Sequence, residues 1–409
     1  MDAARRHRHP AAMGDSASAD FEAARLTVRL PAIAANYRTY RRMTGPTAVA
    51  AVVKADAYGM GAARVAPVLA DAGCDSFFVA RLEEGVALRK AVPRARIFVL
   101  DGVPPDAVPA LISHRLTPAL NSLAEIAAWS AAASVSRTAL DAVLHVDTGM
   151  NRLGLPGDEL AILSAEHGKR LAGLNLVLVM SHLACGDDPR NAMNAEQLSR
   201  FRQALAMLPQ APASLAASHG AMLGLDYHFD LVRPGVALYG ADPQRPEGMG
   251  LEGQNSKSKS PQGAANLMQT AAVLTARVLQ VRRIDSGESV GYAATFRAKR
   301  PSMIATVALG YADGFPRALS GRGVAALDGV RVPVIGRISM DLMTLDVSDL
   351  STNSGGQPHI GQEVELLGDT ISLGEVAELA GTNEYEILTR LRRVPRVYTQ
   401  TPADRETDQ

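Results

Sequence analysis

The chain has few cysteines, no excess charge of either sign and no long apolar run. Cys74 and Cys185 are the two cysteines among 409 residues, which are too few for a disulfide framework and fit a reducing compartment. Lysine and arginine together number 42, as do aspartate and glutamate, so bulk charge favours neither nucleic acid nor a membrane surface as a partner. No apolar stretch is long enough to span a bilayer, and residues 1–22 lack the apolar core of a secretory signal. We therefore expect a cytoplasmic protein with no bound metal and with disordered tails at 1–22 and 399–409.

The length and the pattern of apolar runs predict two domains. Between about residues 46 and 240, short apolar runs alternate with helical patterns such as Leu82–Val92 and Glu196–Leu208. The expected strands are Thr47–Lys54, Asp75–Ala80, Ile97–Leu100, Leu116–Ala119, Ala142–Asp147, Leu174–His182, Ala213–Ser218 and Leu231–Gly240. Eight strands separated by helices predict an α/β protein with an N-terminal (β/α)8 TIM-type barrel over residues 23–242. An open doubly wound sheet is the alternative, although no Gly-x-Gly-x-x-Gly turn follows the first strand.

A region of different composition follows the barrel. Residues 243–265 are rich in Pro, Gly, Ser and Gln, which is the composition of a linker or a surface loop. Within 266–398, alternating apolar and polar residues return with dense turn signals. The expected strands there are Val273–Val281, Ser302–Leu309, Val330–Ile335 and Glu363–Leu367, with one helix near Leu373–Ala380. This pattern predicts a mostly β C-terminal domain.

Lys54 follows an almost wholly apolar run, residues 48–53, and precedes Gly59 and Gly61. The apolar run is typical of a buried strand, and the glycines are typical of a strand-to-helix turn. The ammonium of Lys54 should therefore lie at the carboxyl end of the strand. Desolvation there disfavours the charged form and favours an amine nucleophile that can form a Schiff base with an aldehyde cofactor. The alternative is a lysine whose ammonium reaches solvent.

Polar residues also follow the later strands, at the edge of the barrel where reactive groups gather in this fold. They are Arg152 in the glycine-rich Asp147–Gly154, then His182 and Ser218 at the ends of their strands, while Arg233 lies within the eighth. Taken singly, each residue has an ordinary structural explanation. His182 could be a hydrogen-bonded core histidine, Arg152 could form a surface ion pair, and Ser218 could cap a helix. Arg233 lies inside an apolar strand, where an unpaired charge costs several kcal/mol, so it must have partners. Their joint position at strand ends favours one shared site.

Three motifs of the second domain place polar or aromatic residues beside glycines. They are Ser289–Tyr292, Gly310–Arg317 and Gly336–Asp341. Motifs of this kind can be turns without chemistry, so these residues alone leave their role open.

Together these motifs resemble the alanine racemases, which are fold-type III pyridoxal phosphate enzymes. The motifs VVKADAYGMGA, DTGMNRLG, SHLA, VRPGVALYG, VGY, GYADGFPR and GRISMD occur in family order, followed by Tyr385 and Arg393–Arg396. The resemblance covers roughly residues 25–398, and the set is specific although each motif alone is weak. It implies a homodimer with shared active sites that interconverts L- and D-alanine, for cell-wall synthesis or for alanine catabolism.

The resemblance also implies which residues act on the proton. Lys54 carries pyridoxal phosphate and is the base on the face that handles D-alanine, whereas Tyr292 of the partner subunit is the base for L-alanine. Two bases are sensible because inversion removes a proton from one face of Cα and delivers one to the other. His182 binds that tyrosine and connects to Arg233, which faces the cofactor's ring nitrogen. Because a guanidinium only donates, it leaves this nitrogen unprotonated, which weakens the electron sink and limits transamination.

The resemblance assigns the other residues to cofactor, substrate and the route of access. By this resemblance the phosphate is held by Tyr58, Tyr385, Ser218 and the backbone of Gly235 and Val236. Arg152 contacts the cofactor's phenolic oxygen and the substrate carboxylate, and the substrate is also contacted by Met340 and Tyr311. The access route is lined by Asp187, Arg317 and Arg337, with Tyr311. Two positions depart from the family. Many members have a carbamylated lysine where this chain has His145, so an anion, a water or nothing takes the place of the carbamate. An asparagine is also common in the family where this chain has Ala217.

Three other functions stay open. A racemase of serine or of a broader amino-acid set would use the same scaffold. A non-catalytic pyridoxal phosphate-binding barrel protein would lack the β domain. A fold-type III decarboxylase would bring a cysteine motif from that domain, whereas both cysteines here lie in the barrel half.

Overall fold

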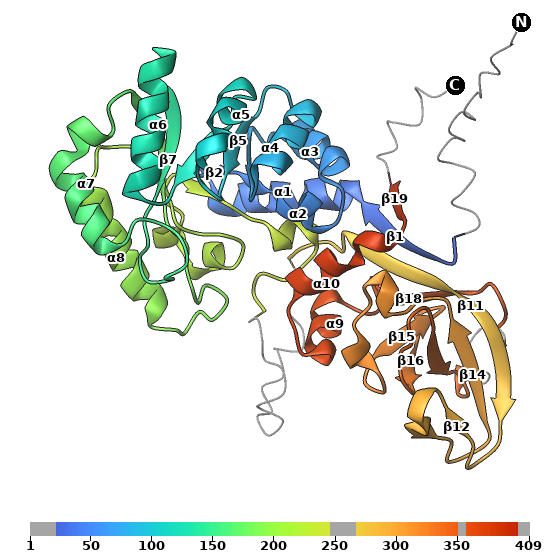
Figure 1. The fold of residues 1–409 in the computed structure, drawn as a ribbon. Helices are drawn as coiled ribbons and strands as arrows, with labels where there is room; N and C mark the ends of the chain where they lie inside the picture. The colour runs from blue at the N-terminus through green and yellow to red at the C-terminus, as the bar shows by residue number, and fades with distance from the viewer. Residues whose placement is uncertain (1–21, 246–266, 351–356, 400–409) are drawn as a thin grey trace, which may run out of the picture.

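The computed structural model describes residues 22–245, 267–350 and 357–399. The tails expected at 1–22 and 399–409 and the linker expected at 243–265 fall almost entirely outside these residues. The described chain forms two units, which Figure 1 shows side by side with β1, β11, β19 and α10 at their junction. We call residues 30–245 the barrel unit, and residues 22–29 with 267–350 and 357–399 the second unit. No helix of the described ranges is long and apolar enough to cross a membrane.

Parallel strands form the centre of the barrel unit. In chain order they are β2 (Ala48–Val49), β3 (Ala51–Val52), β4 (Ser76–Val79), β5 (Arg96–Val99), β6 (Thr117–Leu120), β7 (Leu140–His145), β8 (Leu174–Met180), β9 (Ala213–Ser214) and β10 (Leu231–Val232). Strands β3 to β9 are hydrogen-bonded in sequence order, β10 pairs with β2, and a parallel bridge joins Ala217 to Arg233. Because β2 and β3 are successive parts of one run, these pairings close the sheet. The predicted barrel is confirmed, and the open doubly wound sheet is wrong.

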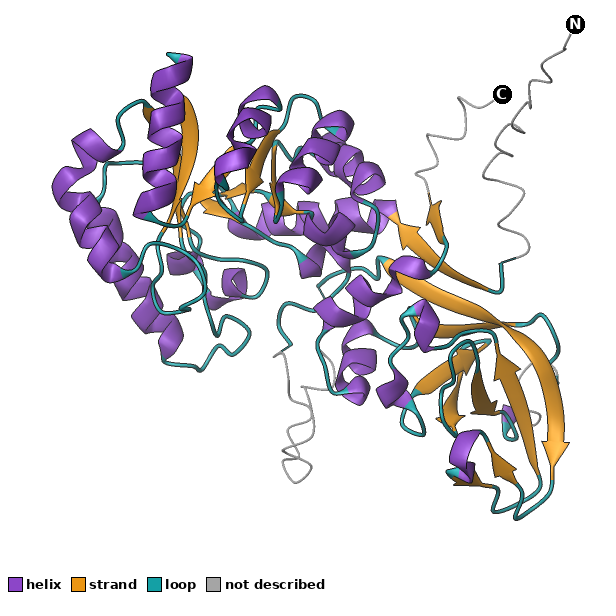
Figure 2. Cartoon of the chain, in the orientation of Figure 1, coloured by secondary structure: helices purple, strands orange, loops and turns teal. Residues whose placement is uncertain are grey.

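Helices follow most of these strands and surround the sheet (Figure 2). They are α1 (Leu30–Thr44), α3 (Ala62–Asp71), α4 (Leu82–Ala91), α5 (Val108–Ser113), α6 (Leu123–Ser136), α7 (Gly157–Arg170) and α8 (Met193–Met207). The start of α6 is capped by Ser122, whose Oγ accepts a hydrogen bond from the backbone N–H of Glu125. On the buried face of α6, the Trp129 indole donates to the Asp141 carbonyl at 3.0 Å. Apolar faces of helices thus cover strands that are themselves apolar on both sides.

The expected strand Leu231–Gly240 is wrong in its second half. Strand β10 ends at Val232, and Val236–Tyr239 form a buried 3-10 turn, η5. Pro234 lacks an N–H to continue a ladder, and Gly235 turns the chain with φ −126° and ψ −91°. An apolar run does not distinguish a buried strand from a buried helical turn, which explains the error.

The second unit is mostly β, as predicted. Its large sheet has the order β14 (Ser302–Val307), β17 (Met343–Asp346), β16 (Val330–Ile335), β15 (Val324–Leu327), β18 (Glu363–Leu367), β11 (Ala272–Ile284), β1 (Ala24–Arg29) and β19 (Arg396–Thr399). Strand β11 also pairs with β14, so six of these strands form a closed ring. A hairpin of β12 (Ser289–Val290) and β13 (Phe296–Arg297) extends from it. Helix α9 (Leu373–Ala380) matches the expected bounds, whereas α10 (Glu384–Arg390) was not predicted.

Strand β1 lies inside the range assigned to the barrel, yet it pairs in the sheet of the second unit. Leu26 is opposite Leu274 of β11 and Arg396 of β19, and both Leu26 and Val28 are buried. Their alternation with polar neighbours fits a sheet with one buried face. The chain therefore begins in the second unit, builds the barrel and returns, which places the ends of the described chain side by side (Figure 1).

Candidate active site

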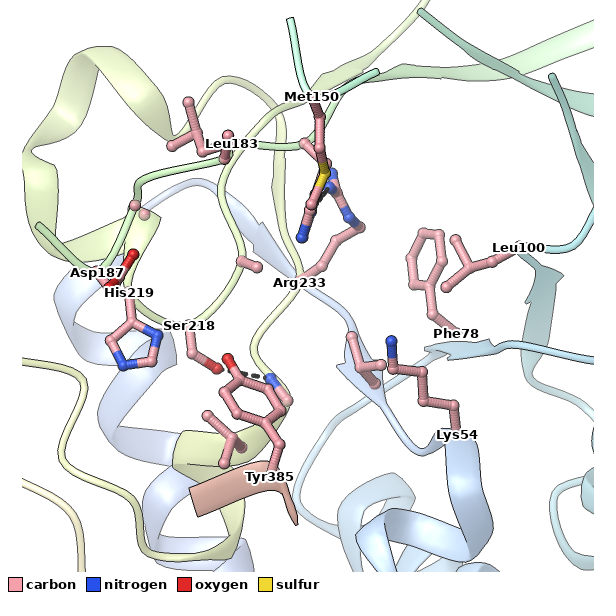
Figure 3. Close-up of a pocket in the computed structure, with 18 of the residues that line it drawn as sticks. Lys54, Phe78, Leu100, Met150, Leu183, Asp187, Ser218, His219, Arg233 and Tyr385 are labelled. Carbon is pink, nitrogen blue, oxygen red and sulfur yellow. Dashed lines mark hydrogen bonds between the residues drawn. The ribbon is translucent and has the colours of Figure 1, made fainter. Parts of the chain in front are cut away.

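A cavity of about 390 Å³ opens at the carboxyl ends of the barrel strands. Figure 3 shows its lining, with Lys54 and Phe78 on one side and Ser218, His219 and Tyr385 on the other. Ten residues predicted for the site line it: Lys54, Tyr58, Arg152, His182, Asp187, Ser218, Arg233, Gly235, Val236 and Tyr385. Tyr385 comes from the second unit and the other nine come from the barrel unit. Within the described ranges, no group of three or more His, Cys, Asp or Glu side chains could hold a metal ion.

Lys54 begins the short helix α2 (Lys54–Tyr58), whose backbone is unusual. The φ angles of Ala55, Asp56, Ala57 and Tyr58 lie between 54° and 56°, so this is a left-handed turn made without glycine. Such a conformation costs roughly 1–2 kcal/mol per residue with a Cβ and therefore requires tertiary support. Figure 3 shows the Lys54 side chain rising from this turn into the cavity.

The surroundings of Lys54 favour its neutral amine. Burial lowers the pKa of Lys54, and the positive charge of Arg152 lowers it further. Glu84 and Asp101 act in the opposite direction but do not reverse the shift. Lys54 is half-buried and lines the cavity, where a lowered pKa makes its amine more available as a nucleophile.

Arg233 is buried, with 4% of its surface exposed, and is held by uncharged groups. Its Nη2 donates to the Ser181 carbonyl at 2.7 Å, and its Nη1 donates to the Ser214 hydroxyl. Burial lowers the pKa of Arg233 to about 10, so the guanidinium keeps its charge near neutral pH. The partners required for an arginine in an apolar strand are thus carbonyl and hydroxyl oxygens.

His182 lies against this guanidinium. Its Nδ1 is 3.5 Å from Nη2 of Arg233. Because a guanidinium only donates, Nδ1 accepts, and the proton of a neutral imidazole lies on Nε2. Burial and then the charge of Arg233 lower the pKa of His182, so the ring is neutral. His182 therefore offers a hydrogen-bond donor at Nε2.

Ser218 and the turn at Gly235 form a set of donors suited to an anion. The Ser218 hydroxyl accepts hydrogen bonds from the backbone N–H of Gly235 at 2.8 Å and of Ala237 at 3.5 Å. A Cβ at residue 235 would collide with the Tyr58 hydroxyl. Only glycine at this position lets the Tyr58 hydroxyl come so close to the backbone of the turn. The Tyr58 ring is also 5.9 Å from that of Tyr385. Because the Ser218 oxygen accepts these two bonds, its hydroxyl proton points elsewhere, and a hydroxyl donor beside this backbone turn fits a phosphate.

Arg152 lies on a loop whose shape is set by Asp147. The Asp147 carboxylate accepts hydrogen bonds from the backbone N–H groups of Gly149 and Met150, each at 2.9 Å, and from that of Asn151. The backbone at 154 packs so closely that a Cβ there would lie 2.8 Å from the Asp147 nitrogen, which requires glycine. The loop thus places Arg152 in the cavity lining while leaving it exposed.

His145 lines the cavity in a fixed tautomer. Its Nδ1 is 2.8 Å from Oδ1 of Asn121, whose Nδ2 donates to the carbonyls of Ala119 and Leu100. Asn121 Oδ1 is therefore an acceptor, His145 Nδ1 carries the proton, and Nε2 is free to accept. Burial and then the charge of Arg233 lower the pKa of His145 to about 4. Asn121 was not predicted as a site residue, although it directly follows strand β6, and a place after a strand is the signal that identified the other residues.

The other predicted residues of the second unit lie outside this cavity in the single chain. The exposed fractions of Tyr292, Met340 and Tyr311 are 72%, 54% and 39%. Arg317 and Arg337 are also exposed. The sequence assigned Tyr292 to the partner subunit and the other four residues to the substrate or its access route, and none of the five lines the cavity of a single chain.

Four of these residues nevertheless gather on one surface of the second unit. The backbone N–H of Ala312, which follows Tyr311, donates to the Met340 carbonyl at 2.9 Å. A Cβ on Gly291, which precedes Tyr292, would lie 3.3 Å from the Arg337 nitrogen. We call Tyr292, Tyr311, Arg337 and Met340 the tyrosine surface.

Comparison with known proteins agrees with the motifs and with the fold. Residues 28–243 match the alanine racemase N-terminal domain family, and residues 271–398 match the C-terminal domain family. An alanine racemase of Brucella abortus is 45% identical over 375 residues, covering 91% of this chain and 93% of the relative. A catabolic alanine racemase of Agrobacterium fabrum is 44% identical over 377 residues, covering 92% of both chains.

Solved structures give the same result. The alanine racemase of Bartonella henselae, solved with covalently bound pyridoxal phosphate, has a TM-score of 0.83 and 39% identity, and the match covers 92% of this chain and 99% of that one. The biosynthetic alanine racemase of Pseudomonas aeruginosa has a TM-score of 0.82 and 34% identity, covering 93% of this chain and 100% of that one. With both domain families matched in order, this chain belongs to the alanine racemase family of isomerases.

Proposed function

We propose that this protein interconverts L- and D-alanine with pyridoxal phosphate held on Lys54. The observation that carries the proposal is the content of one cavity: a desolvated lysine, a buried arginine and the donors around Ser218. The covalently bound pyridoxal phosphate of the Bartonella henselae relative supports the choice of cofactor.

The lining fits the polar groups of this cofactor. Lys54 would hold its aldehyde carbon, and Arg233 would face its ring nitrogen. Its phosphate would take the donors that meet at Ser218 and the backbone of Gly235 and Val236, with the hydroxyl groups of Tyr58 and Tyr385. When bound, the cofactor withdraws electrons from the Cα–H bond of the substrate and so makes that proton removable.

Two residues would move the proton. The amine of Lys54, whose pKa burial lowers, is suited to accept or return a proton on one face of Cα. Inversion needs a second group on the opposite face, and we assign this role to Tyr292 of the partner subunit. His182 would support that tyrosine by donating from Nε2, because Arg233 occupies Nδ1.

The exposure of the tyrosine surface supports a homodimer with shared sites. Tyr292 and Met340 are large apolar side chains that remain exposed in a single chain, and Leu342 beside them is exposed too. Exposed apolar patches of this kind mark protein interfaces. Each cavity would then combine the Lys54 of one subunit with the tyrosine surface of the other.

The same arrangement would bring the substrate-binding residues together. Arg152 would bind the substrate carboxylate from the barrel side, because its guanidinium fork matches a carboxylate. The partner's Met340 and the partner's Tyr311 would complete the pocket. Asp187 of the cavity lining, with the partner's Arg317 and the partner's Arg337, would line the route of access.

The biological role that we infer is D-alanine supply for cell-wall synthesis or alanine catabolism. The similarity to a catabolic and to a biosynthetic enzyme supports both roles equally. Cys74 and Cys185 are unpaired thiols, and Cys74 is buried, which supports a reducing and hence cytoplasmic setting.

The experiment that tests the function is chiral analysis of alanine after incubation of cofactor-loaded protein with L-alanine. We expect D-alanine to accumulate until the two enantiomers are present in equal amounts. A protein that binds the cofactor and leaves L-alanine unchanged would exclude alanine racemisation. Serine in the same assay tests the broader racemase, and release of carbon dioxide tests the decarboxylase.

A further inference from the structure

The left-handed turn after Lys54 determines which side chains of this segment line the cavity. Lys54 and Tyr58 lie at its two ends, and both line the cavity. Four consecutive non-glycine residues in this conformation are rare, because their Cβ atoms crowd the following carbonyl groups. The contacts that hold the turn therefore also determine the direction of the lysine.

On the barrel side the turn is held by Glu84 of α4. Its Oε1 accepts a hydrogen bond from the backbone N–H of Ala55 at 2.6 Å, and its Oε2 accepts from that of Ala80 at 2.9 Å. One carboxylate thus ties the first left-handed residue to the end of the neighbouring strand β4.

On the other side the turn is held by the second unit of the same chain. Arg396 of β19 donates from Nη1 to Oδ2 of Asp56 at 2.6 Å and to the carbonyl of Gly59 at 3.0 Å. The other carboxylate oxygen of Asp56 accepts from the backbone N–H of Ala62 at 2.8 Å. Arg396 therefore binds both the middle and the end of the turn, through residues 340 and 337 positions away in the sequence.

Two further contacts show that the second unit fits closely against this segment. A Cβ at residue 59 would lie 2.8 Å from the Leu388 carbonyl of α10, and one at residue 61 would collide with the Tyr398 hydroxyl of β19. Both glycines have positive φ, 86° and 88°. Helix α10 and strand β19 thus pack against backbone rather than against flexible side chains.

We propose that Arg396 is a positioning residue for Lys54, because its contacts with Asp56 and the Gly59 carbonyl hold the left-handed turn that directs the lysine into the cavity. The second unit then completes the lysine side of the site within one chain, separately from any residue that a partner subunit supplies. This inference rests on the proposed cofactor role of Lys54.

The main test compares Arg396→Leu with wild type in two assays on the full-length protein. The first follows acetylation of Lys54 in the apoprotein as a function of pH by mass spectrometry, with the exposed Lys90 of α4 as internal reference. The second follows covalent capture of pyridoxal phosphate at Lys54. We expect Lys54 to titrate at higher pH, because displacement from the cavity would return its ammonium to water. Capture near pH ~7 should slow by about tenfold or more, because a displaced nucleophile loses its alignment.

A matched control removes an arginine from the same sheet. Arg25 of β1 forms an ion pair with Glu363 at 2.6 Å, whereas Arg396 binds Asp56 of the turn. Arg25→Leu should leave both assays unchanged, while Arg396→Leu alters them. Equal behaviour of the two variants would overturn the proposal.

A rescue variant tests the conformation itself. Ala55→Gly removes the Cβ of a half-buried residue with φ 54°, and glycine adopts this conformation without the steric cost. Added to Arg396→Leu, it should restore most of the lost capture rate, and absence of any rescue would contradict a role in holding the turn. Should Arg396→Leu fail to fold, Asp56→Asn removes the charge attraction from the other side and should cause a smaller change in the same direction.

The two failures are distinguishable. Absence of capture at Lys54 in the wild-type protein would reject the proposed function. Normal capture in wild type and an Arg396→Leu variant that resembles Arg25→Leu would reject only the positioning role.

Discussion

The cavity of the barrel unit and the tyrosine surface of the second unit differ in how their polar groups are held. Arg233, His182 and His145 have fixed partners in one chain, and burial shifts the pKa of each. Tyr292 and Met340 are exposed on turns of the second unit. The chemistry of the first group is therefore set by folding, whereas that of the second group would be set by association.

The largest effect that would test the barrel side is expected from Lys54→Ala. Loss of the amine removes both the attachment point of the cofactor and one of the two bases, so racemisation should be abolished. Borohydride treatment followed by peptide mapping should find no labelled lysine. Lys90→Ala, which changes an exposed lysine on α4, is the control and should behave as wild type. Labelling at another lysine in the Lys54→Ala protein would refute the assignment.

The next largest effect is expected on the side of the second unit. Tyr292→Phe should keep the cofactor bound, because the groups proposed to hold it, such as Lys54, Arg233 and Ser218, line the barrel cavity and are unchanged. Loss of a general base should slow removal of the α-proton of L-alanine by about 10²–10⁴-fold. Exchange of the α-proton with deuterated water measures this step for each enantiomer separately. Unchanged exchange from L-alanine would exclude the two-base scheme.

A mixed dimer makes the comparison sharper. One subunit carries Lys54→Ala and the other carries Tyr292→Phe, each with its own affinity tag. If the sites are shared, one cavity of this dimer has both changes and the other has neither, so about half of the wild-type activity should return. Sites built from a single chain would give no recovery, because each cavity would then keep one change.

The smallest expected change concerns stability rather than turnover. Burial lowers the pKa of His145 to about 4, so the folded apoprotein holds this ring neutral while an unfolded chain protonates it below about pH 6.5. The unfolded state thus binds more protons in this window, and stability falls as the pH decreases from about 6.5 to about 4, by on the order of 3 kcal/mol.

His145→Gln should reduce this acid-induced loss, because glutamine does not titrate. Urea denaturation of the apoprotein at about pH 7 and about pH 5 measures the difference between variant and wild type. An identical pH dependence in the two proteins would show that His145 does not contribute to it.

Much of the architecture was predictable because burial imposes a local pattern on the sequence. Strand β18 and helix α9 have the predicted bounds, and the strand before Lys54 is where its apolar run indicated. Such patterns follow from the period of side chains on a strand or a helix, so short segments carry them. The position of β1 was not predictable in this way. Its alternation predicts a strand, but only its partners β11 and β19 assign it to the second unit.

Part of the candidate site was predictable for the same reason. Lys54, His182, Ser218 and Arg233 follow barrel strands, and the carboxyl ends of those strands meet at one cavity. Asn121 follows β6 in the same manner and was overlooked.

The sequence by itself determined that this chain builds a barrel and a β unit, and that a lysine lies at a strand end. Only the tertiary structure decided the left-handed turn at 55–58, because Ala, Asp, Ala and Tyr favour the right-handed conformation when local sterics alone act. Arg396, from the far end of the described chain, and Glu84 hold these residues in the left-handed conformation instead. The separation of Tyr292 from Lys54 was decided at the same level, because it depends on where two units of one chain lie rather than on any pattern within either.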